Sequence, residues 1–196
     1  MAGLTAGSYS ITISDSCGSP VTLSVQITEP GAISLTKVVS DVKCNGANNG
    51  SVNLSASGGV APYSYIWSNS ATTGDISNLS PSTYYVTVND ACSQTSIDSA
   101  VVNQPATLIA TITKTDVSCN GLGDGTATVN AAGGTTPYIN QWNNSQNTAT
   151  AVGLFAGFQS VNVFDFNNCI ASNSVVIIQP QALNVIVIAS DATCGN

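Results

Sequence analysis

The side chains best suited to chemistry in this sequence are six cysteines, at Cys17, Cys44, Cys92, Cys119, Cys169 and Cys194. Structural zinc is usually bound by cysteines in C-x-x-C pairs or together with histidine. The chain contains neither a histidine nor a C-x-x-C pair. An even number of cysteines without a metal pattern instead predicts disulfides, and therefore an oxidising compartment. The alternative is that they are buried free thiols.

Composition and charge exclude several classes of function. Only three residues are Lys or Arg and the formal net charge is −7, so the phosphates of a nucleic acid would find almost no cationic partner. Without histidine, a nucleophile with its base and orienting group is hard to assemble, and we expect no enzyme. No apolar run approaches the roughly 20 residues that span a bilayer. We therefore expect no membrane insertion, and any export signal would lie outside this segment.

Two aspartates are the candidates for a metal site. Asp90 and Asp165 each end a predicted strand, and calcium at a junction between repeats would use such carboxylates. A Ca²⁺ site requires several oxygen ligands, however, so we favour a turn-capping role for both residues. No other cofactor is expected.

The aromatic residues predict either a core strand or a sugar-binding platform. Alternation places Tyr63, Tyr65 and Trp67 on one face of a strand, and Tyr138 and Trp142 hold related positions. Because an inward-facing strand requires the same alternation, core packing is the favoured interpretation. A platform for a surface polysaccharide is the alternative.

The sequence repeats itself. The stretch "GGVAPYSYIW" at 58–67 returns as "GGTTPYINQW" at 133–142, and Cys44, Cys119 and Cys194 keep the same step of 75 residues. Such a period indicates a tandem array. We predict complete repeats at 31–105 and 106–180, the C-terminal part of a preceding repeat at 1–30 and the start of a following repeat at 181–196.

Each repeat is predicted to be all-β. Alternating or β-branched runs bounded by turn residues occur in the first repeat at 33–43, 51–56, 63–67, 73–79, 84–89 and 96–103. About six short strands in about 75 residues predict tandem immunoglobulin-like antiparallel β-sandwich repeats. Trp67 and Trp142 then occupy the place of the buried tryptophan, and Tyr84 that of the tyrosine corner.

This fold leaves two disulfide patterns open. Cys44–Cys92 and Cys119–Cys169 would lie within repeats and leave two cysteines single, whereas Cys17–Cys44, Cys92–Cys119 and Cys169–Cys194 would use all six cysteines and span the junctions. We favour the second pattern slightly, because the ends of the first and penultimate strands lie at opposite poles of an immunoglobulin-like sandwich. Such a separation exceeds the roughly 7 Å Cα reach of a disulfide.

The segments "CNGANNGSVNLSASGGVAPYSYIWSN" (44–69) and "CNGLGDGTATVNAAGGTTPYINQWNN" (119–144) resemble the SprB repeat of cell-surface adhesins in gliding Bacteroidetes. "LSPSTYYVTVNDAC" (79–92) resembles the second half of those repeats, usually L-x-x-G-x-Y-x-V-x-V-x-D-x-x-G-C. This sequence lacks the glycine before Cys92, and the second repeat has Phe158 and Gln159 where the first has Thr83 and Tyr84.

The resemblance implies giant secreted proteins, exported by the type IX route and displayed on the bacterial cell surface for adhesion and gliding. We therefore expect a structural segment of a cell-surface filament or adhesin stalk, whose partners are neighbouring repeats. The alternatives are a polysaccharide-binding module and a self-assembling extracellular fibre subunit that pairs with copies of itself.

Overall fold

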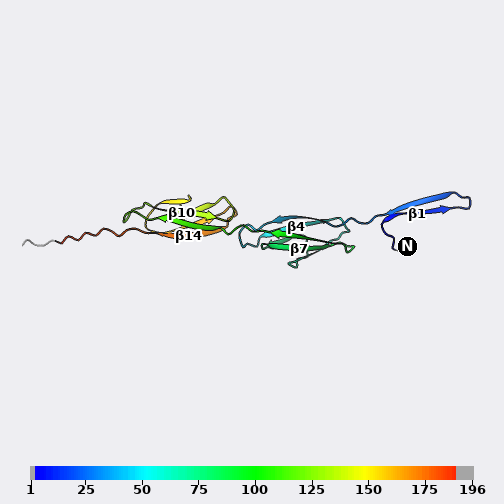
Figure 1. Ribbon diagram of the computed structural model, residues 1–196, viewed down its shortest axis with the longest axis horizontal. Coiled ribbons are helices and arrows are strands. Elements are labelled where there is room, and N and C mark those ends of the chain that lie inside the picture. The colour runs from blue at the N-terminus through cyan, green and yellow to red at the C-terminus, as the bar shows by residue number, and fades with distance from the viewer. Residues whose placement is uncertain (1–2, 189–196) are drawn as a thin grey trace, which may run out of the picture. The chain divides into compact units, whose positions relative to one another are not determined.

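The computed structural model describes residues 3–188, in which all regular secondary structure is β-strand, as predicted (Figure 1). Every strand pairing in this range is antiparallel. Within residues 3–188 there is no helix long and apolar enough to cross a membrane.

The first repeat forms two three-stranded sheets. One has the order β3-β4-β6 and the other β5-β7-β8. Side chains alternate between core and solvent, so that Val52 on one sheet and Val86 and Val88 on the other are almost fully buried. The strands are β3 (Ser34–Ser40), β4 (Gly50–Ser57), β5 (Ser64–Trp67), β6 (Ile76–Leu79), β7 (Ser82–Asn89) and β8 (Thr95–Val102).

The second repeat builds the same sandwich at a step of 75 residues, except that β12 begins one residue early. Its sheets have the orders β12-β10-β9 and β11-β13-β14. Ala127, Val161 and Val163 are fully buried in its core. The strands are β9 (Ile109–Thr115), β10 (Gly125–Ala132), β11 (Ile139–Trp142), β12 (Thr150–Leu154), β13 (Gly157–Phe164) and β14 (Ile170–Ile177).

A single hairpin precedes the first sandwich. It consists of β1 (Gly7–Ser14) and β2 (Pro20–Ile27), paired from Gly7↔Ile27 to Ser14↔Pro20. These strands match β7 and β8 at the 75-residue step, but Ile11 is 56% exposed where its equivalent, Val86, is 1% exposed. The hairpin therefore has the sequence of a core sheet and presents it to solvent.

The boundaries of the two compact units differ from those of the sequence repeats at one loop. The first unit includes the residues up to Asp41 and Asn48–Asn103, and the second includes Val42–Ala47 and the residues from Gln104 onward. The loop Val42–Ala47 follows β3 of the first repeat, yet it belongs to the second unit. This loop contains Cys44.

The predicted tyrosine corner is present in the first repeat. The Tyr84 hydroxyl donates a hydrogen bond to the Ser80 carbonyl oxygen at 2.9 Å, and Tyr9 in the hairpin makes the equivalent bond to Thr5 at 2.8 Å. The second repeat has Gln159 at this position, so this hydroxyl contact cannot form there.

Candidate functional site

A disulfide joins Cys44 to Cys169, which are 125 positions apart in sequence, with their Cα atoms 5.7 Å apart. Both predicted patterns are therefore wrong for these two cysteines. The first pattern assumed that a cysteine pairs within its own repeat, and the second that it pairs across the nearest proline junction. The Cys44 loop instead belongs to the second unit and is bonded to the β13–β14 turn.

The remaining predicted disulfide cysteines have different outcomes. Cys17, Cys92 and Cys119 are free and exposed, so the predicted pairings Cys17–Cys44, Cys92–Cys119, Cys44–Cys92 and Cys119–Cys169 are all absent. The predicted Cys169–Cys194 bond is excluded because Cys169 already bonds Cys44. Cys194 itself lies outside the described residues.

Hydrogen bonds on both sides of Cys44 hold its loop in place. The Asn45 side-chain amide donates to the Pro105 carbonyl oxygen at 2.9 Å, and the Gly46 backbone N–H donates to Gln104 Oε1 at 2.8 Å. On the other side, Asn167 Nδ2 donates to the Lys43 carbonyl oxygen at 3.1 Å. The polar contacts fix the loop independently of the sulfur–sulfur bond.

Asp165 organises the turn that carries Cys169. Its Oδ1 accepts hydrogen bonds from the backbone N–H groups of Asn167 at 2.8 Å and Cys169 at 2.9 Å, and its Oδ2 accepts one from the Thr135 N–H at 2.8 Å. The side chain is only 2% exposed. A carboxylate with three amide donors is well satisfied without a counter-ion.

Asp90 performs the same task in the first repeat. Its Oδ2 accepts from the Val60 N–H, and its Oδ1 accepts from the N–H groups of Cys92 and Gln94. Burial raises the pKa of Asp90, but these amide hydrogen bonds outweigh burial and bring the pKa below its ordinary value. Both aspartates therefore cap turns. No group of three metal-binding side chains occurs among residues 3–188, and calcium at Asp90 or Asp165 stays a prediction.

A pair of adjacent glycines allows the loop that precedes β11 to come close to Asp165. Gly133 and Gly134 have φ values of 74° and 58°, in the left-handed region. A Cβ on Gly133 would lie 2.0 Å from the Thr107 carbonyl oxygen, and one on Gly134 would lie 2.7 Å from Asp165 Oδ2. Gly58 and Gly59 repeat this arrangement. The glycine pair thus permits the contact between loop and turn.

The loop around Cys119 is a second copy of the Cys44 loop. Asn120 Nδ2 donates to the Pro180 carbonyl oxygen at 3.1 Å, and the Gly121 N–H donates to Gln179 Oε1 at 3.0 Å. The Leu122 N–H closes the turn on the Cys119 carbonyl oxygen at 3.2 Å, as Ala47 does on Cys44 at 3.1 Å. Cys119 differs from Cys44 because its thiol is exposed and free.

The two tryptophans are in the core, as the favoured interpretation expected, and the alternative of an exposed glycan platform is wrong for them. Trp67 and Trp142 are each 2% exposed, and their indole N–H groups donate to the carbonyl oxygens of Thr73 and Thr148. The tyrosines are half-buried: Tyr65 lies on the same strand as Trp67, and the hydroxyls of Tyr63 and Tyr138 donate to the backbone at Gly58 and Gly133. These residues do not form an exposed platform.

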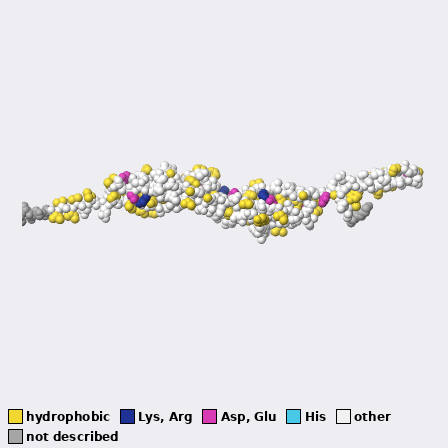
Figure 2. Space-filling model, viewed as in Figure 1, with side chains coloured by type: hydrophobic (Ala, Val, Ile, Leu, Met, Phe, Trp, Pro, Cys, Tyr) yellow, Lys and Arg dark blue, Asp and Glu magenta, His cyan; other side chains and the backbone are white. Residues whose placement is uncertain are grey.

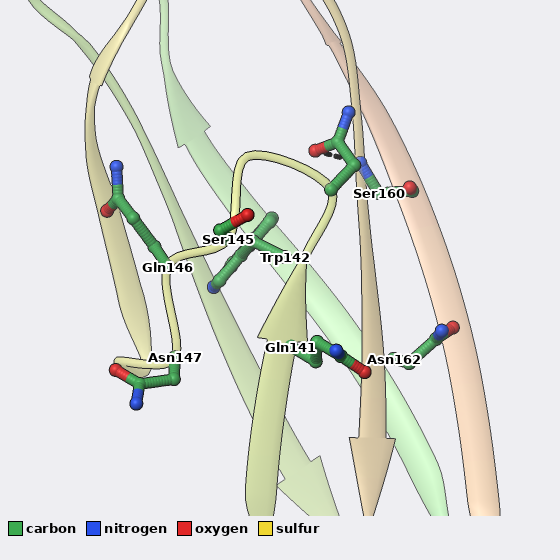
Figure 3. Close-up of a pocket in the computed structure, with 8 residues that line it drawn as sticks. Gln141, Trp142, Ser145, Gln146, Asn147, Ser160 and Asn162 are labelled. Atoms are coloured by element: carbon green, nitrogen blue, oxygen red, sulfur yellow. Dashed lines mark hydrogen bonds between the residues drawn. The ribbon is translucent and has the colours of Figure 1, made fainter.

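A polar cavity of about 530 Å³ lies beside Trp142 (Figure 3). Gln141 on β11 and Asn162 on β13 are direct partners in the sheet, and both line the cavity. The first repeat has Ile66 and Thr87 at these two positions, so the pair of amides is particular to the second repeat. The other lining residues are Trp142, Asn143, Ser145, Gln146, Asn147 and Ser160.

Two lysines form ion pairs with aspartates, and Figure 2 shows the few charged groups scattered over a mostly uncharged surface. Lys37 contacts Asp98 at 2.7 Å and Lys114 contacts Asp116 at 2.6 Å. The hydrogen bond from Lys37 lowers the pKa of Asp98. The Ile178 N–H, followed by Lys114, lowers the pKa of Asp116. The sequence did not predict these pairs because the two lysines are not at equivalent positions.

Comparison with known proteins identifies a family in two segments. Residues 36–72 and 111–147 match the SprB repeat family, again at a 75-residue step. No curated protein is significantly similar to the chain.

Two similar solved structures are longer than this chain. One is titled "Structural basis for Dscam isoform specificity" (13% identity, TM-score 0.35, covering 84% of this chain and 52% of that chain). Another is the C-terminal 282-residue fragment of intimin in complex with the intimin-binding domain of the translocated intimin receptor (13% identity, TM-score 0.34, covering 87% and 57%). The chain thus spans about half the length of each.

Proposed function

The chain carries SprB repeats at residues 36–72 and 111–147, and from this premise we propose that it is a structural repeat segment of a secreted bacterial cell-surface filament or adhesin stalk. Such a segment serves to lengthen the filament and to hold other parts of the protein away from the cell surface, and it needs no catalytic residue. Its partners in this role are neighbouring repeats of the same protein. Adhesion, gliding and export by the type IX route follow from family membership in this proposal.

The observation that supports the proposal most is the Cys44–Cys169 bond. In a tandem array each repeat contacts mainly its neighbours, so a fibre gains from links that reach from one repeat into the next. The Cys44 loop comes from the first repeat and is bonded to a turn of the second. A disulfide also requires an oxidising environment, which supports an extracellular location.

The surface composition supports the same location. The polar part of the exterior is built mainly from uncharged side chains, because only 7% of the chain is charged. A net charge of −7 with no histidine leaves little to attract nucleic acid or to perform acid–base catalysis. These properties favour a structural role over nucleic-acid binding or acid–base catalysis.

Immunogold labelling of intact source cells tests the proposal. Antibodies raised against residues 31–180 are expected to label material outside the outer membrane without permeabilisation. An antibody to a periplasmic protein serves as the control and should label only opened cells. Labelling of the repeat only after permeabilisation would contradict a surface location.

A second candidate function is binding of a neutral polysaccharide by the second repeat. The observation that favours it is the cavity beside Trp142, where Gln141 and Asn162 offer amide donors and acceptors without charge. Gln141→Ala combined with Asn162→Ala should abolish retardation in polysaccharide gels, while Ile66→Ala, at the equivalent position of the first repeat, should not. Migration unaffected by every polysaccharide tested would remove this candidate.

A further inference from the structure

We propose that Cys119 forms a second disulfide of the same kind, to the cysteine in the turn that corresponds to the β13–β14 turn of another repeat joined after the second. Successive bonds would then overlap along an array. The inference rests on the repeat geometry and goes beyond the proposed stalk function, because it assigns a covalent role to a thiol that is free in this chain.

The first reason is that the loop carrying Cys119 is already in the bonded shape. The two side chains that hold the Cys44 loop, Asn45 and Gln104, have the equivalents Asn120 and Gln179. Their hydrogen bonds in the second repeat are within about 0.2 Å of those in the first. The glycine after the asparagine has φ 75° in the first loop and φ 80° in the second.

The second reason is that the turn carrying the bonded partner is part of the repeat. The first repeat also has a cysteine in this turn, Cys92, but two positions earlier, and Gln94 stands at the place of Cys169. Cys169 lies in the β13–β14 turn, fixed by Asp165 through its own N–H. A further copy of this repeat brings the same turn with the same aspartate and cysteine. Cys44 is half-buried in its bonded state whereas Cys119 is exposed, as expected of the same loop without its partner.

The spacing makes the bonds overlap. The existing bond encloses the sequence from Cys44 to Cys169, and the next begins at Cys119, before the first one closes. Residues 119–169 therefore lie inside both loops. A single break in the backbone there would leave the two halves joined by two disulfides, so such an array would survive cleavage that would sever an unlinked chain.

Bond formation requires an external disulfide as the oxidant. The Cys119 thiolate attacks a low-molecular-weight disulfide such as oxidised glutathione, giving a mixed disulfide and one molecule of the thiol. The thiolate of the incoming Cys169 equivalent then displaces the second molecule of thiol. Two protein thiols lose two protons and two electrons in total, and one glutathione disulfide becomes two glutathione molecules.

A tandem duplication tests the proposal on the full chain. One extra copy of residues 106–180 is inserted after Pro180, and the protein is refolded in a glutathione redox buffer and mapped without reduction. The expected result is that Cys119 of the first copy is bonded to Cys169 of the inserted copy, with Cys44–Cys169 retained as the internal proof of folding. An alkylated Cys119, or one bonded elsewhere, while Cys44–Cys169 is present would overturn the proposal.

Two matched variants sharpen the test. Cys169→Ser in the inserted copy alone should return the first Cys119 to the alkylated pool. A protease recognition sequence placed after Asn144 of the first copy should leave one band on a non-reducing gel after cleavage, even when Cys44→Ser removes the existing bond. Release of two fragments from that cut Cys44→Ser array would show that the second bond is absent.

Discussion

Cys44 lies in the loop after β3 of the first repeat and Cys169 lies in the β13–β14 turn of the second, yet their Cα atoms are 5.7 Å apart. The loop from Val42 to Ala47 belongs to the second compact unit. The bond thus joins a loop of one sequence repeat to a turn of the repeat that follows it. Both cysteines belong to the same compact unit.

Removing this bond should destabilise the second unit. A disulfide that closes a loop of more than about 100 residues contributes up to about 5 kcal/mol through loop-closure entropy. Cys44→Ser should therefore lower the melting temperature of one calorimetric transition. Cys92→Ser is the matched control, because Cys92 is free and exposed. An equal, small effect of both variants would show that the bond does not stabilise the fold.

The glycine pair should be intolerant of a side chain. Gly133→Ala places a Cβ 2.0 Å from the Thr107 carbonyl oxygen at a φ of 74°, so we expect a loss of more than about 2 kcal/mol in unfolding free energy. Gly121→Ala separates the effect of the steric clash from the effect of the positive φ. Gly121 also has a positive φ, 80°, but no atom lies within 4 Å of its added Cβ. Urea unfolding should show the smaller loss, about 1–2 kcal/mol, for Gly121→Ala, and the reverse order would contradict the steric explanation.

The fold should lose stability in acid. Hydrogen bonds lower the pKa in the folded state of four aspartates: Asp90, Asp98, Asp116 and Asp124. Their contribution is complete above the unfolded pKa of about 3.9 and is lost as the pH falls through the lower folded values. Thermal melts between pH 7 and pH 2 should fall steeply only below about pH 4. In Asp90→Asn the decline should be shallower, and an identical slope would argue against a role for this carboxylate.

One half-buried side chain of the second repeat has an unsatisfied oxygen that a substitution can remove. Asn140 Oδ1 is buried without a hydrogen-bond partner, at the position where the first repeat has Tyr65. Because an unsatisfied buried oxygen costs about 1–3 kcal/mol, Asn140→Val should raise the free energy of unfolding by about 1 kcal/mol. Asn147→Val, at an exposed position, should change it by less than about 0.5 kcal/mol. A destabilised Asn140→Val protein would show that the oxygen is satisfied in solution.

Much of the fold could be predicted from sequence, because it is encoded locally. Alternation in "YSYIW" places Trp67 in the core, and the repeat of "GG" and "PY" at a constant step sets the second sandwich. The left-handed φ values at Gly58 and Gly59 are those that only glycine adopts readily. These features depend on residues close together in the chain.

The disulfide could not be predicted in the same way. Its partners are 125 residues apart, and their proximity depends on a loop of one repeat belonging to the compact unit of the next. One signal was present: "CNG" follows β3 and β9 at the same spacing, and Gln104 and Gln179 each stand immediately before a junction proline, Pro105 and Pro180. Without the structure, nothing linked those two short motifs.

The most direct test of this account is non-reducing peptide mapping of the chain by mass spectrometry after alkylation of free thiols. We predict one peptide pair joined through Cys44 and Cys169, with Cys17, Cys92 and Cys119 alkylated. Peptides joined through Cys44 and Cys92, or through Cys17 and Cys44, would contradict the bond between the Cys44 loop and the turn of the second repeat, and with it the proposed links between repeats.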